Sequence, residues 1–401
     1  MTDATTVQAR MTTHTLTGGL VTLFAFCCGA IVANLYYAQP IVELIAPDIG
    51  LSADGASLIV SLTQIGYALG LLLLVPLADL FENRKLMIGS ALIAGACLLA
   101  AGMSRQPNVF LLLSLLIGFS SVSVQMLIPL AAHLAPEESR GRVVGNIMGG
   151  LLLGILLARP ISSLVADHFG WRMVFFGAAA VMLVIILVMA LTIPARKPTQ
   201  HTTYARLMGS LISLVRTQPV LRQRALYQGF MFASFSLFWT AAPIELMRHH
   251  GLSQTQIAIF ALVGAIGALA APIAGRMADA GHTYKASGAA MLIAAGAFLI
   301  GWTGVGYSVI GLALTGVLLD FACQMNMVLG QRAVYALDAH SRARLNALYM
   351  TTIFIGGAIG SAIASPLYEA AGWTGVVIAG GALPLIALLV FLFKEHASNQ
   401  A

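Results

Sequence analysis

The stretch VPLADLFENRK, residues 75–85, is a short charged break between two long apolar runs. A related stretch, GRMADAGHTYK, follows 200 positions later at residues 275–285. In both, an apolar run containing small residues ends at an Ala-Asp pair, turns, and meets a cation before the next run begins. Two such breaks at corresponding places indicate that the chain consists of two copies of one apolar unit.

Composition places this unit in a membrane. Of the 401 residues, 59% are hydrophobic and 9% are charged, against about a quarter charged in ordinary globular proteins. The mean hydropathy of +0.90 assigns most of the chain to hydrocarbon. The four cysteines lie within apolar runs and predict no disulfide framework. The formal charge of +6 comes from cations scattered between apolar runs, so we expect anionic lipid beside them and no nucleic-acid partner.

Twelve apolar runs are long enough to cross a bilayer, which takes about twenty residues. We expect helices, because lipid offers no hydrogen-bond partner to an open strand. The predicted fold is an all-α membrane protein with twelve transmembrane helices in two pseudo-symmetric six-helix bundles, residues 1–194 and 221–401, joined by a cytoplasmic linker at 195–220. The runs lie near residues 16–44, 56–79, 86–104, 108–134, 142–166, 172–194, 221–246, 253–278, 284–303, 306–334, 344–368 and 373–393.

The two halves also match residue by residue at an offset of 202. The matched pairs include SRGR at 139–142 with SRAR at 341–344, Gly170-Trp171 with Gly372-Trp373, and Glu43 with Glu245. So many pairs in register support a duplicated six-helix unit. Glu43 and Glu245 fall near the outer ends of their runs, where we expect water to reach them.

The distribution of cations predicts the orientation. With the N-terminus in the cytoplasm, only Arg105, Arg172 and Arg248 lie in outer loops, and Lys and Arg prefer cytoplasmic loops. We therefore expect a multi-pass protein of the inner (plasma) membrane with both termini cytoplasmic. The cations on the cytoplasmic side would be Arg10, Arg84, Lys85, Arg140, Arg142, Arg196, Lys197, Arg206, Arg216, Arg222, Arg224, Arg276, Lys285, Arg342, Arg344 and Lys394.

With twelve spans, a central linker and an Asp-containing loop after the second span, the chain resembles the major facilitator superfamily over essentially its whole length. The family's loop motif reads roughly G-x-L-A-D-R-x-G-R-R/K; Asp79, Arg84 and Lys85 match it in the first copy and Asp279 in the second. In that family such an aspartate helps to latch the outward-facing state through loop cations and a helix terminus. The resemblance thus implies a latch at these four residues, with simple helix capping favoured for Asp279.

The stretches NLYYAQP at 34–40 and GILLARP at 154–160 are similar to the drug:proton antiporter and arabinose-efflux-permease-like branch. The resemblance implies a monomer whose two bundles rock about a site near the bilayer midplane. Spans one, four, seven and ten would line the cavity. Spans two and eleven, and five and eight, would meet between the bundles.

Span ten carries Asp320, Gln324, Met327 and Gln331 on one helical stripe. Asp320 lies about twelve residues into the span, roughly 18 Å of helical rise and close to mid-membrane. A charged, unpaired carboxylate there costs several kcal/mol, so it is either neutral or facing water or a cation. We predict that Asp320 is the proton-coupling residue; the alternative is a structural acid bound to an arginine.

Arg159 is the matching cation, about seventeen residues into span five by the same helical count. Three alternative roles stay open for Arg159. The first is pairing with Asp320 across the bundles, with release of Asp320 on proton uptake. The second is to anchor an anionic substrate, and the third is to bind backbone carbonyls.

Polar and aromatic residues of the cavity-forming spans are the candidates for substrate contact. They suit an aromatic, weakly polar pocket for amphipathic or planar organic molecules, although small polar residues on one helix face also serve close packing. The predicted cavity residues are Asn34, Tyr37, Ser121, Gln125, Gln228, Trp239 and Gln324.

These features predict a secondary active transporter that couples export of a small organic compound to protons by alternating access. The alternative is proton-coupled uptake of a metabolite or organic anion, with Arg159 as the anchor. An intramembrane enzyme ranks third, because the sequence lacks H-E-x-x-H, G-x-x-x-x-G-K-[ST] and G-x-S-x-G motifs. We expect a small-molecule substrate, protons and the bilayer as partners, and no cofactor, metal site or enzymatic activity.

Overall fold

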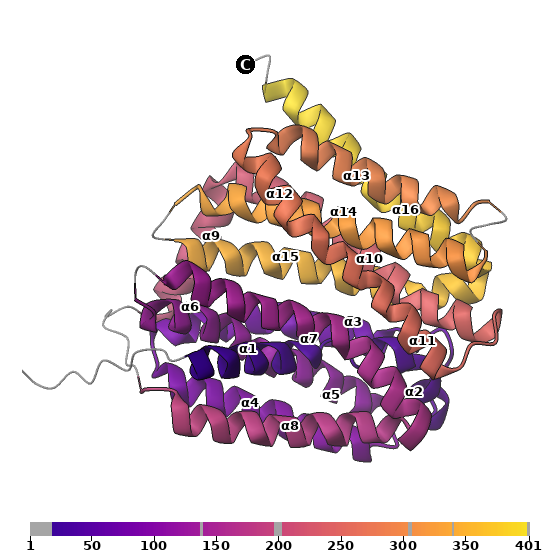
Figure 1. Cartoon of the computed structure of the whole chain (residues 1–401), viewed down its shortest axis with the longest axis horizontal. Coiled ribbons are helices and arrows are strands. Elements are labelled where there is room, and N and C mark those ends of the chain that lie inside the picture. Colours follow the sequence, from indigo (N-terminus) through magenta and orange to yellow (C-terminus); the bar gives the residue numbers. More distant parts are fainter. Residues whose placement is uncertain (1–17, 137–138, 196–202, 304–306, 339–340, 399–401) are drawn as a thin grey trace, which may run out of the picture.

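The computed structural model describes residues 18–136, 139–195, 203–303, 307–338 and 341–398. The described elements are helices, and they form two bundles that lie one above the other in Figure 1, with α1–α8 below, most of α10–α16 above, and α11 reaching down beside the first bundle. This is the expected all-α fold of two six-helix bundles. Three cations of the orientation prediction, Arg10, Arg196 and Lys197, lie outside the described residues.

The elements follow the apolar runs closely. The first bundle contains α1 Gly18–Ala33, η1 Gln39–Ile41, α2 Val42–Asp48, α3 Leu58–Leu73, η2 Val75–Asp79, α4 Asn83–Met103, α5 Pro107–Ser120, η3 Ser121–Ser123, α6 Val124–Leu134, α7 Arg140–Phe169 and α8 Trp171–Thr192, where η marks a 3-10 helix. The helix α9 Tyr204–Thr217 comes next. The second bundle contains α10 Pro219–Arg248, α11 Gln254–Ala261, η4 Leu262–Leu269, α12 Ala270–Asp279, α13 Thr283–Ile300, α14 Val309–Tyr335, α15 Arg342–Ala362 and α16 Ala364–Ser398.

The first span differs from the prediction. Within the described residues, eleven helices are long and apolar enough to cross a membrane, and α1 is a shorter apolar helix of 16 residues. The predicted run 16–44 is not one straight helix, because α1 ends at Ala33 and the chain turns before η1 and α2. Pro40 lies in the first turn of η1, a position where the missing N–H of proline is tolerated. The first span is therefore α1, a turn, η1 and α2 in succession.

Two glycines break the helical path at corresponding places. Gly170 has φ 85° and Gly372 has φ 61°, a backbone region that glycine enters without steric cost. Gly170 separates α7 from α8, and Gly372 kinks α16. The eleventh predicted run, 344–368, covers most of α15, which ends at Ala362, and the first residues of α16, which precede the kink at Gly372. The shared glycine position agrees with the repeat of 202 residues.

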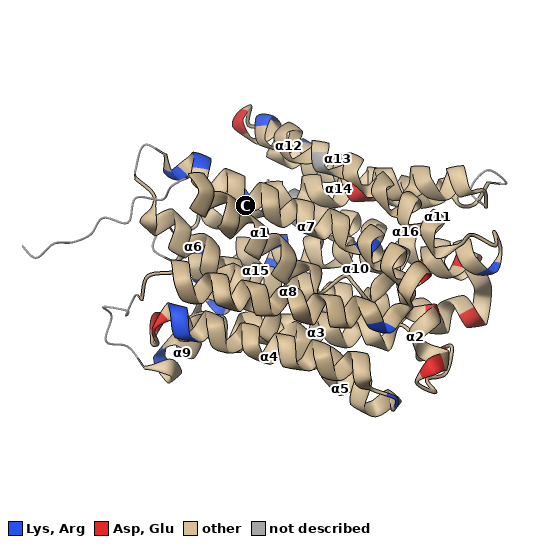
Figure 2. Cartoon of the chain, turned by 60° about the horizontal axis from the view of Figure 1, so that its bottom comes forward, with Lys and Arg blue, Asp and Glu red and all other residues tan. Residues whose placement is uncertain are grey.

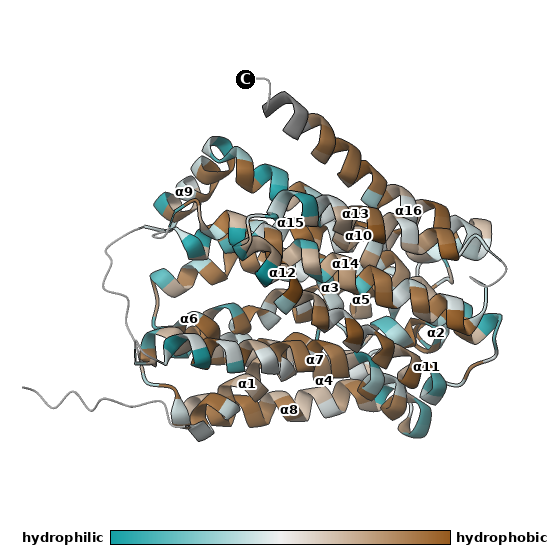
Figure 3. Cartoon of the chain, turned by 45° about the horizontal axis from the view of Figure 1, so that its top comes forward, coloured by the Kyte–Doolittle hydropathy of each residue, from teal (hydrophilic) through white to brown (hydrophobic). Residues whose placement is uncertain are grey.

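Burial separates peripheral from central helices. On α8, Leu183, Leu187 and Leu191 recur every four residues and are 63%, 59% and 77% exposed, so this stripe faces lipid rather than protein. The most apolar window of α10 is 83% buried, against 39% for α8. Figure 3 shows strongly hydrophobic colour along α8 and α4. The chain is an integral membrane protein with α10 at its centre.

The bundles meet where the resemblance implied. Helix α15 packs on α3, and α11 packs on α7, which pairs spans two with eleven and five with eight. We call the end of the molecule where α3 gives way to α4 the Asp79 face, and the end where α10 finishes the Arg248 face. In Figure 2, lysines and arginines gather beside α6 and α9 at the Asp79 face, and acidic residues gather near α2 at the Arg248 face.

Candidate functional site

One stripe of α10 faces the first bundle. Its members are Phe232, Phe235, Ser236, Trp239 and Thr240, at a spacing that places them on the same side of a helix. The hydroxyl oxygen of Ser236 accepts a hydrogen bond from Gln64 Nε2 at 2.9 Å, and that of Thr240 accepts one from Gln39 Nε2 at 3.2 Å. Two glutamines of the first bundle thus hold successive turns of α10.

Arg159 lies against this stripe and is only 4% exposed. Its Nε donates to Gln39 Oε1 at 2.8 Å. Its guanidinium carbon lies 4.6 Å from the ring centroid of Trp239, 5.2 Å from Tyr36 and 5.4 Å from Phe235, distances at which a cation is attracted to a ring face. Its Nη2 is buried without a hydrogen-bond partner. A buried donor without a partner is costly, so this atom is available to an oxygen of a ligand.

Asp320 lies on the other side of Trp239. The carboxylate is 8% exposed, and Trp239 Nε1 donates to Oδ1 at 2.6 Å. The described ion pairs do not include one between Asp320 and Arg159. In this state the direct pairing considered from the sequence is replaced by an indirect link, because the indole face contacts the cation and the indole N–H binds the anion.

Two further predicted cavity residues lie inside the first bundle. Asn34 Nδ2 donates to Ser121 Oγ at 3.3 Å and lies 3.5 Å from the sulfur of Met182. The structure therefore brings Asn34 and Ser121 together between spans one and four. The backbone oxygen of Tyr37 accepts from Ser162 Oγ at 2.5 Å, and this contact fixes the turn after α1 to α7.

The predicted cavity residues of the second bundle are divided. Gln228 is completely buried; its Nε2 donates to the backbone oxygen of Cys323 at 3.1 Å, and its Oε1 accepts from Asn326 Nδ2 at 2.7 Å. Gln324 lies on α14 four residues after Asp320 and is half-buried. Gln228 thus serves contacts within the bundle, whereas Trp239 belongs to the Arg159 and Asp320 site.

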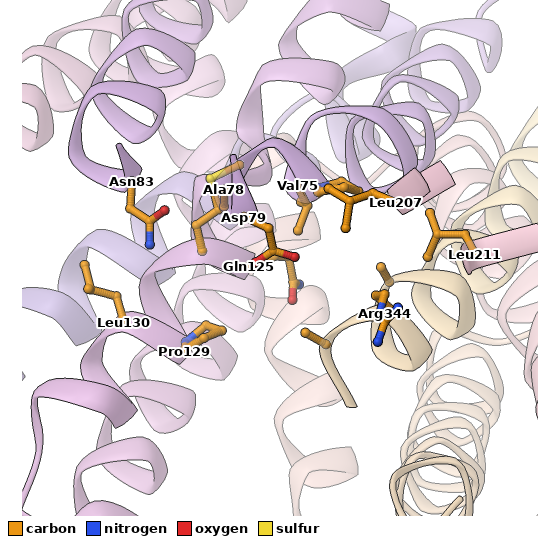
Figure 4. A pocket seen from close by; sticks show the side chains of 14 residues that line it. Val75, Ala78, Asp79, Asn83, Gln125, Pro129, Leu130, Leu207, Leu211 and Arg344 are labelled. Carbon is orange, nitrogen blue, oxygen red and sulfur yellow. The ribbon is translucent and has the colours of Figure 1, made fainter. Parts of the chain in front are cut away.

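A pocket opens between the bundles at the Asp79 face (Figure 4). Its walls come from η2, α6, α9 and the first turns of α15, and they include Asp79, Gln125 and Arg344. Gln125 Nε2 donates to the Tyr67 hydroxyl at 3.2 Å, and Gln125 Oε1 accepts from Asn346 Nδ2 at 3.4 Å. The cavity volume is about 140 Å³, well below the roughly 300–1,000 Å³ of most small-molecule sites. We therefore place substrate contact deeper, at the α10 stripe.

The four residues of the implied latch do not converge. Asp79 is exposed at the pocket, while Arg84 donates to the backbone oxygen of Ala190 at the end of α8, where a cation stabilises a helix C-terminus. Lys85 lies 3.4 Å from Glu82. Arg84 thus binds the end of α8, and Lys85 pairs with an acid of its own loop.

The second copy of the loop is bound within its own bundle. Asp279 pairs with Arg332 at 2.5 Å, and the same arginine donates to Gly275 O at 2.7 Å. This arrangement agrees with the structural role that the sequence favoured for Asp279. Within the described residues, no cluster of three or more His, Cys, Asp or Glu could hold a metal.

The Arg248 face is closed by contacts that sequence reasoning missed. Arg248 pairs with Glu43 of the first bundle at 2.8 Å and with Glu369 of the second at 2.5 Å. Glu245 was expected to meet water, but it is 3% exposed and accepts from the Tyr368 hydroxyl at 2.6 Å. The interfacial role predicted for Glu245 is therefore wrong, because α16 folds over it. The signal available in the sequence was His249, four residues after the acid, whose Nδ1 lies 2.9 Å from Glu245 Oε2.

Comparison with known proteins agrees with this architecture. A sequence model of the Major Facilitator Superfamily matches residues 21–233 and 224–401. The uncharacterized transporter YgaY of Escherichia coli O157:H7 is 40% identical, covering 97% of this chain and 98% of the relative. The chloramphenicol resistance protein of Streptomyces lividans is 24% identical, covering 94% of this chain and 97% of the relative.

Among solved structures, a mutant form of the nucleoside transporter NupG aligns with a TM-score of 0.74 at 13% identity, covering 93% of this chain and 99% of that one. At this identity the likeness concerns the fold. With its whole-length family match and twelve spans in two bundles, this chain belongs to the major facilitator superfamily.

Proposed function

We propose that the protein is a proton-coupled secondary transporter that exports a small organic or amphipathic compound by alternating access, and that it is not an enzyme. The observation that carries this proposal is the buried Asp320, held by Trp239 at the centre of the molecule. A mid-membrane carboxylate marks an ion or substrate path more often than a packing position. The 24% identity to a chloramphenicol resistance protein supports the drug:proton antiporter branch and the outward direction.

In this proposal the proton acts on the link through Trp239. A charged Asp320 binds the indole N–H, and Trp239 in turn contacts Arg159 of the other bundle. A proton on the carboxylate removes the charge that strengthens this bond. The contact between α14, α10 and α7 then weakens, which changes the relative stability of the two bundle arrangements. Export would take compound from the Asp79 face and release it at the Arg248 face.

The remaining assignments follow from this cycle. Asn34, Tyr37, Ser121, Gln125 and Gln324 are proposed to border the path, with Gln228 supporting its wall from inside the second bundle. Asp79, Arg84 and Lys85 are proposed to act at the latch, and Asp279, the fourth latch residue implied by the resemblance, to hold its own loop through Arg332. We place the Asp79 face and both termini in the cytoplasm of a cell with an inner (plasma) membrane, because cations gather at that face. The working unit is taken as a monomer of two bundles, 1–194 and 221–401, with the linker 195–220.

A second function is favoured by one specific observation. The unpartnered Nη2 of Arg159 would satisfy an oxygen of a carboxylate, as in proton-coupled uptake of an organic anion. Anion binding beside Asp320 would be stronger when that residue is protonated, because two anions repel. Proton and anion would then move together, which corresponds to symport rather than exchange.

Energised inside-out vesicles separate these functions. A pH-sensitive dye would report proton movement while a panel of hydrophobic cations, neutral aromatics and aromatic carboxylates is added to wild type and to Asp320→Asn. Export predicts that a compound collapses the gradient in wild type alone. Equal collapse in both proteins would contradict Asp320 as the proton site. Carboxylates that are active only in right-side-out vesicles would favour the uptake function instead.

A further inference from the structure

The eighth span contains an unusual backbone segment. It begins as α11 and ends as α12, but its middle, η4, is a 3-10 helix of eight residues from Leu262 to Leu269. Runs of 3-10 helix beyond three or four residues are uncommon and often mark functional segments. The corresponding residues of the first bundle, 60–67 at the offset of 202, lie inside the continuous α-helix α3. The irregular backbone is therefore a property of the second bundle alone.

Two glycines of η4 pack directly on Asp320. A Cβ added at Gly264 would lie 2.5 Å from Asp320 Oδ2 and 3.2 Å from Trp239 Cζ2. A Cβ added at Gly267 would lie 2.6 Å from Asp320 Cβ and 3.0 Å from its backbone carbon. Each added Cβ would thus lie closer than 3.0 Å to an atom of Asp320, which packed side chains do not tolerate. The missing side chains at these two positions create the space that the carboxylate occupies.

The repeat shows that this space is specific to the second bundle. The position that corresponds to Asp320 in span four is Gly118, and a Cβ there would lie 1.9 Å from the backbone oxygen of Thr63 in span two. The positions that correspond to Gly264 and Gly267 are Leu62 and Ile65. In the first bundle glycines stand on both helices of this contact, since a Cβ at Gly66 of span two would lie 1.9 Å from the backbone oxygen of Leu115. In the second bundle the glycines of span eight face a carboxylate instead.

From this geometry we propose that Gly264 and Gly267 are positioning residues, whose backbone forms the wall that holds the Asp320 carboxylate against the indole N–H of Trp239. The proposal rests on the function proposed above and deepens it, because it assigns the part of span eight that sets the environment of the proton site. The glycines act through Asp320 and touch neither the proton nor the compound. The contact of η4 with α7 gives this wall a second neighbour in the first bundle.

Other groups near the carboxylate could also influence its titration. Arg159 from α7 acts on it from behind Trp239, Tyr36 lies beside that arginine, and Cys323 follows one turn later on α14. None of these side chains is changed by a substitution at Gly264. An effect of Gly264→Ala on titration would therefore arise where the wall contacts Asp320 and the ring of Trp239, whose Cζ2 lies 3.2 Å from the added Cβ.

The test uses Trp239 as its own probe. The full-length protein has four tryptophans, so labelling with 5-fluorotryptophan gives four ¹⁹F resonances, and Trp239→Phe identifies the relevant one. The control is Gly296→Ala in α13, where an added Cβ meets nothing within 4 Å. We expect the Trp239 resonance to titrate in wild type and in Gly296→Ala, and not in Asp320→Asn. In Gly264→Ala the midpoint should rise by about one pH unit, since the charged form loses a hydrogen bond.

The outcomes distinguish this inference from the proposed function. If Asp320→Asn abolishes the titration but Gly264→Ala keeps the wild-type midpoint, the glycines do not position the carboxylate and the inference is overturned. If Asp320→Asn still titrates, the proton site itself is wrong. Thermal unfolding supplies a second readout should Gly264→Ala fold poorly. The added methyl should lower Tm less in Asp320→Ala, where the clash is gone, than in wild type; an equal loss in both would contradict the proposal.

Discussion

The two faces of the molecule are held together in different ways. At the Arg248 face, Ser57 and Ser365 each donate a backbone N–H to the other's hydroxyl at 3.2 Å, and Arg248 pairs with Glu43 at 2.8 Å. At the Asp79 face, a pocket lies between the bundles, and the bond from Asn346 to Gln125 is 3.4 Å long. The difference shows which side is closed in this state.

The comparison also concerns sequence motifs. The recognisable loop motif marks the face with the pocket, whereas the closed face is made by serines and acids that belong to no motif. A closed face must present complementary groups from both bundles, and these can be any donor and acceptor at the correct distance. The loop motif is therefore a poor guide to which face is closed, because each copy lies within a single bundle.

The largest effect on this comparison is expected from Ser57→Ala combined with Ser365→Ala. Both serines are buried, so each lost hydroxyl leaves a buried N–H without a partner at about 1–3 kcal/mol. Two such losses come to at least about 2 kcal/mol, so we expect labelling of a Ser61→Cys reporter by a membrane-impermeant maleimide to increase about thirtyfold or more. The four native cysteines are buried and should contribute little background. Ser104→Ala, which loses a bond within the first bundle, is the control, and an equal increase there would contradict the assignment.

Arg248→Ala should have a smaller effect on the same reporter. The Arg248 side chain is 33% exposed, so solvent weakens its ion pairs and each is worth about 0.2–1 kcal/mol. We expect labelling to increase about threefold and to increase less in high salt. Arg105→Ala removes an exposed cation from the same face and should leave labelling unchanged. An effect of Arg248→Ala as large as that of the two serine changes would show that the ion pairs, not the serines, close this face.

Asp79→Asn should decrease labelling of the Ser61→Cys reporter, and this effect should be the smallest of the three. If Asp79 latches the arrangement in which its own face is closed, its loss favours the present state, and Ser61→Cys labelling should fall about twofold, as for one exposed charge interaction. Asp279→Asn is a matched control, because Asp279 pairs with Arg332 inside the second bundle. A similar decrease in Asp279→Asn would remove the distinction between the two loop copies.

Much of the fold could be predicted from the sequence. Apolar length and the repeat are local properties, so they are readable without knowing which helices touch. Asp320 also stood out, since a carboxylate inside an apolar run is rare. The bend after α1 was missed because apolar residues on both sides of NLYYAQP, residues 34–40, were taken with it as one run. The turn is fixed by a contact with a distant helix, from Ser162 Oγ to the backbone oxygen of Tyr37.

The arrangement inside the site could not be predicted. Whether Arg159 meets Asp320 directly or through Trp239 depends on the rotation of α10 about its axis, which no pattern in a single chain specifies. Burial of Glu245 likewise depends on α16 folding over it with Tyr368. Both contacts join residues more than 80 positions apart, and helix pairing at that range is decided by tertiary packing rather than by local sequence.

The central claim is that the charge on Asp320 decides which face is closed. Electron–electron double resonance would measure it with spin labels across the Arg248 face, at Ser52→Cys and Thr303→Cys, and across the Asp79 face, at Phe81→Cys and His282→Cys, which are all exposed positions. Distances would be recorded at pH 5 and pH 8 in wild type and in Asp320→Asn. The account predicts that the wild-type distributions change with pH, in opposite directions at the two faces, and that Asp320→Asn gives the pH 5 distribution at both values. The same pH-dependent change in Asp320→Asn, or none in wild type, would contradict it.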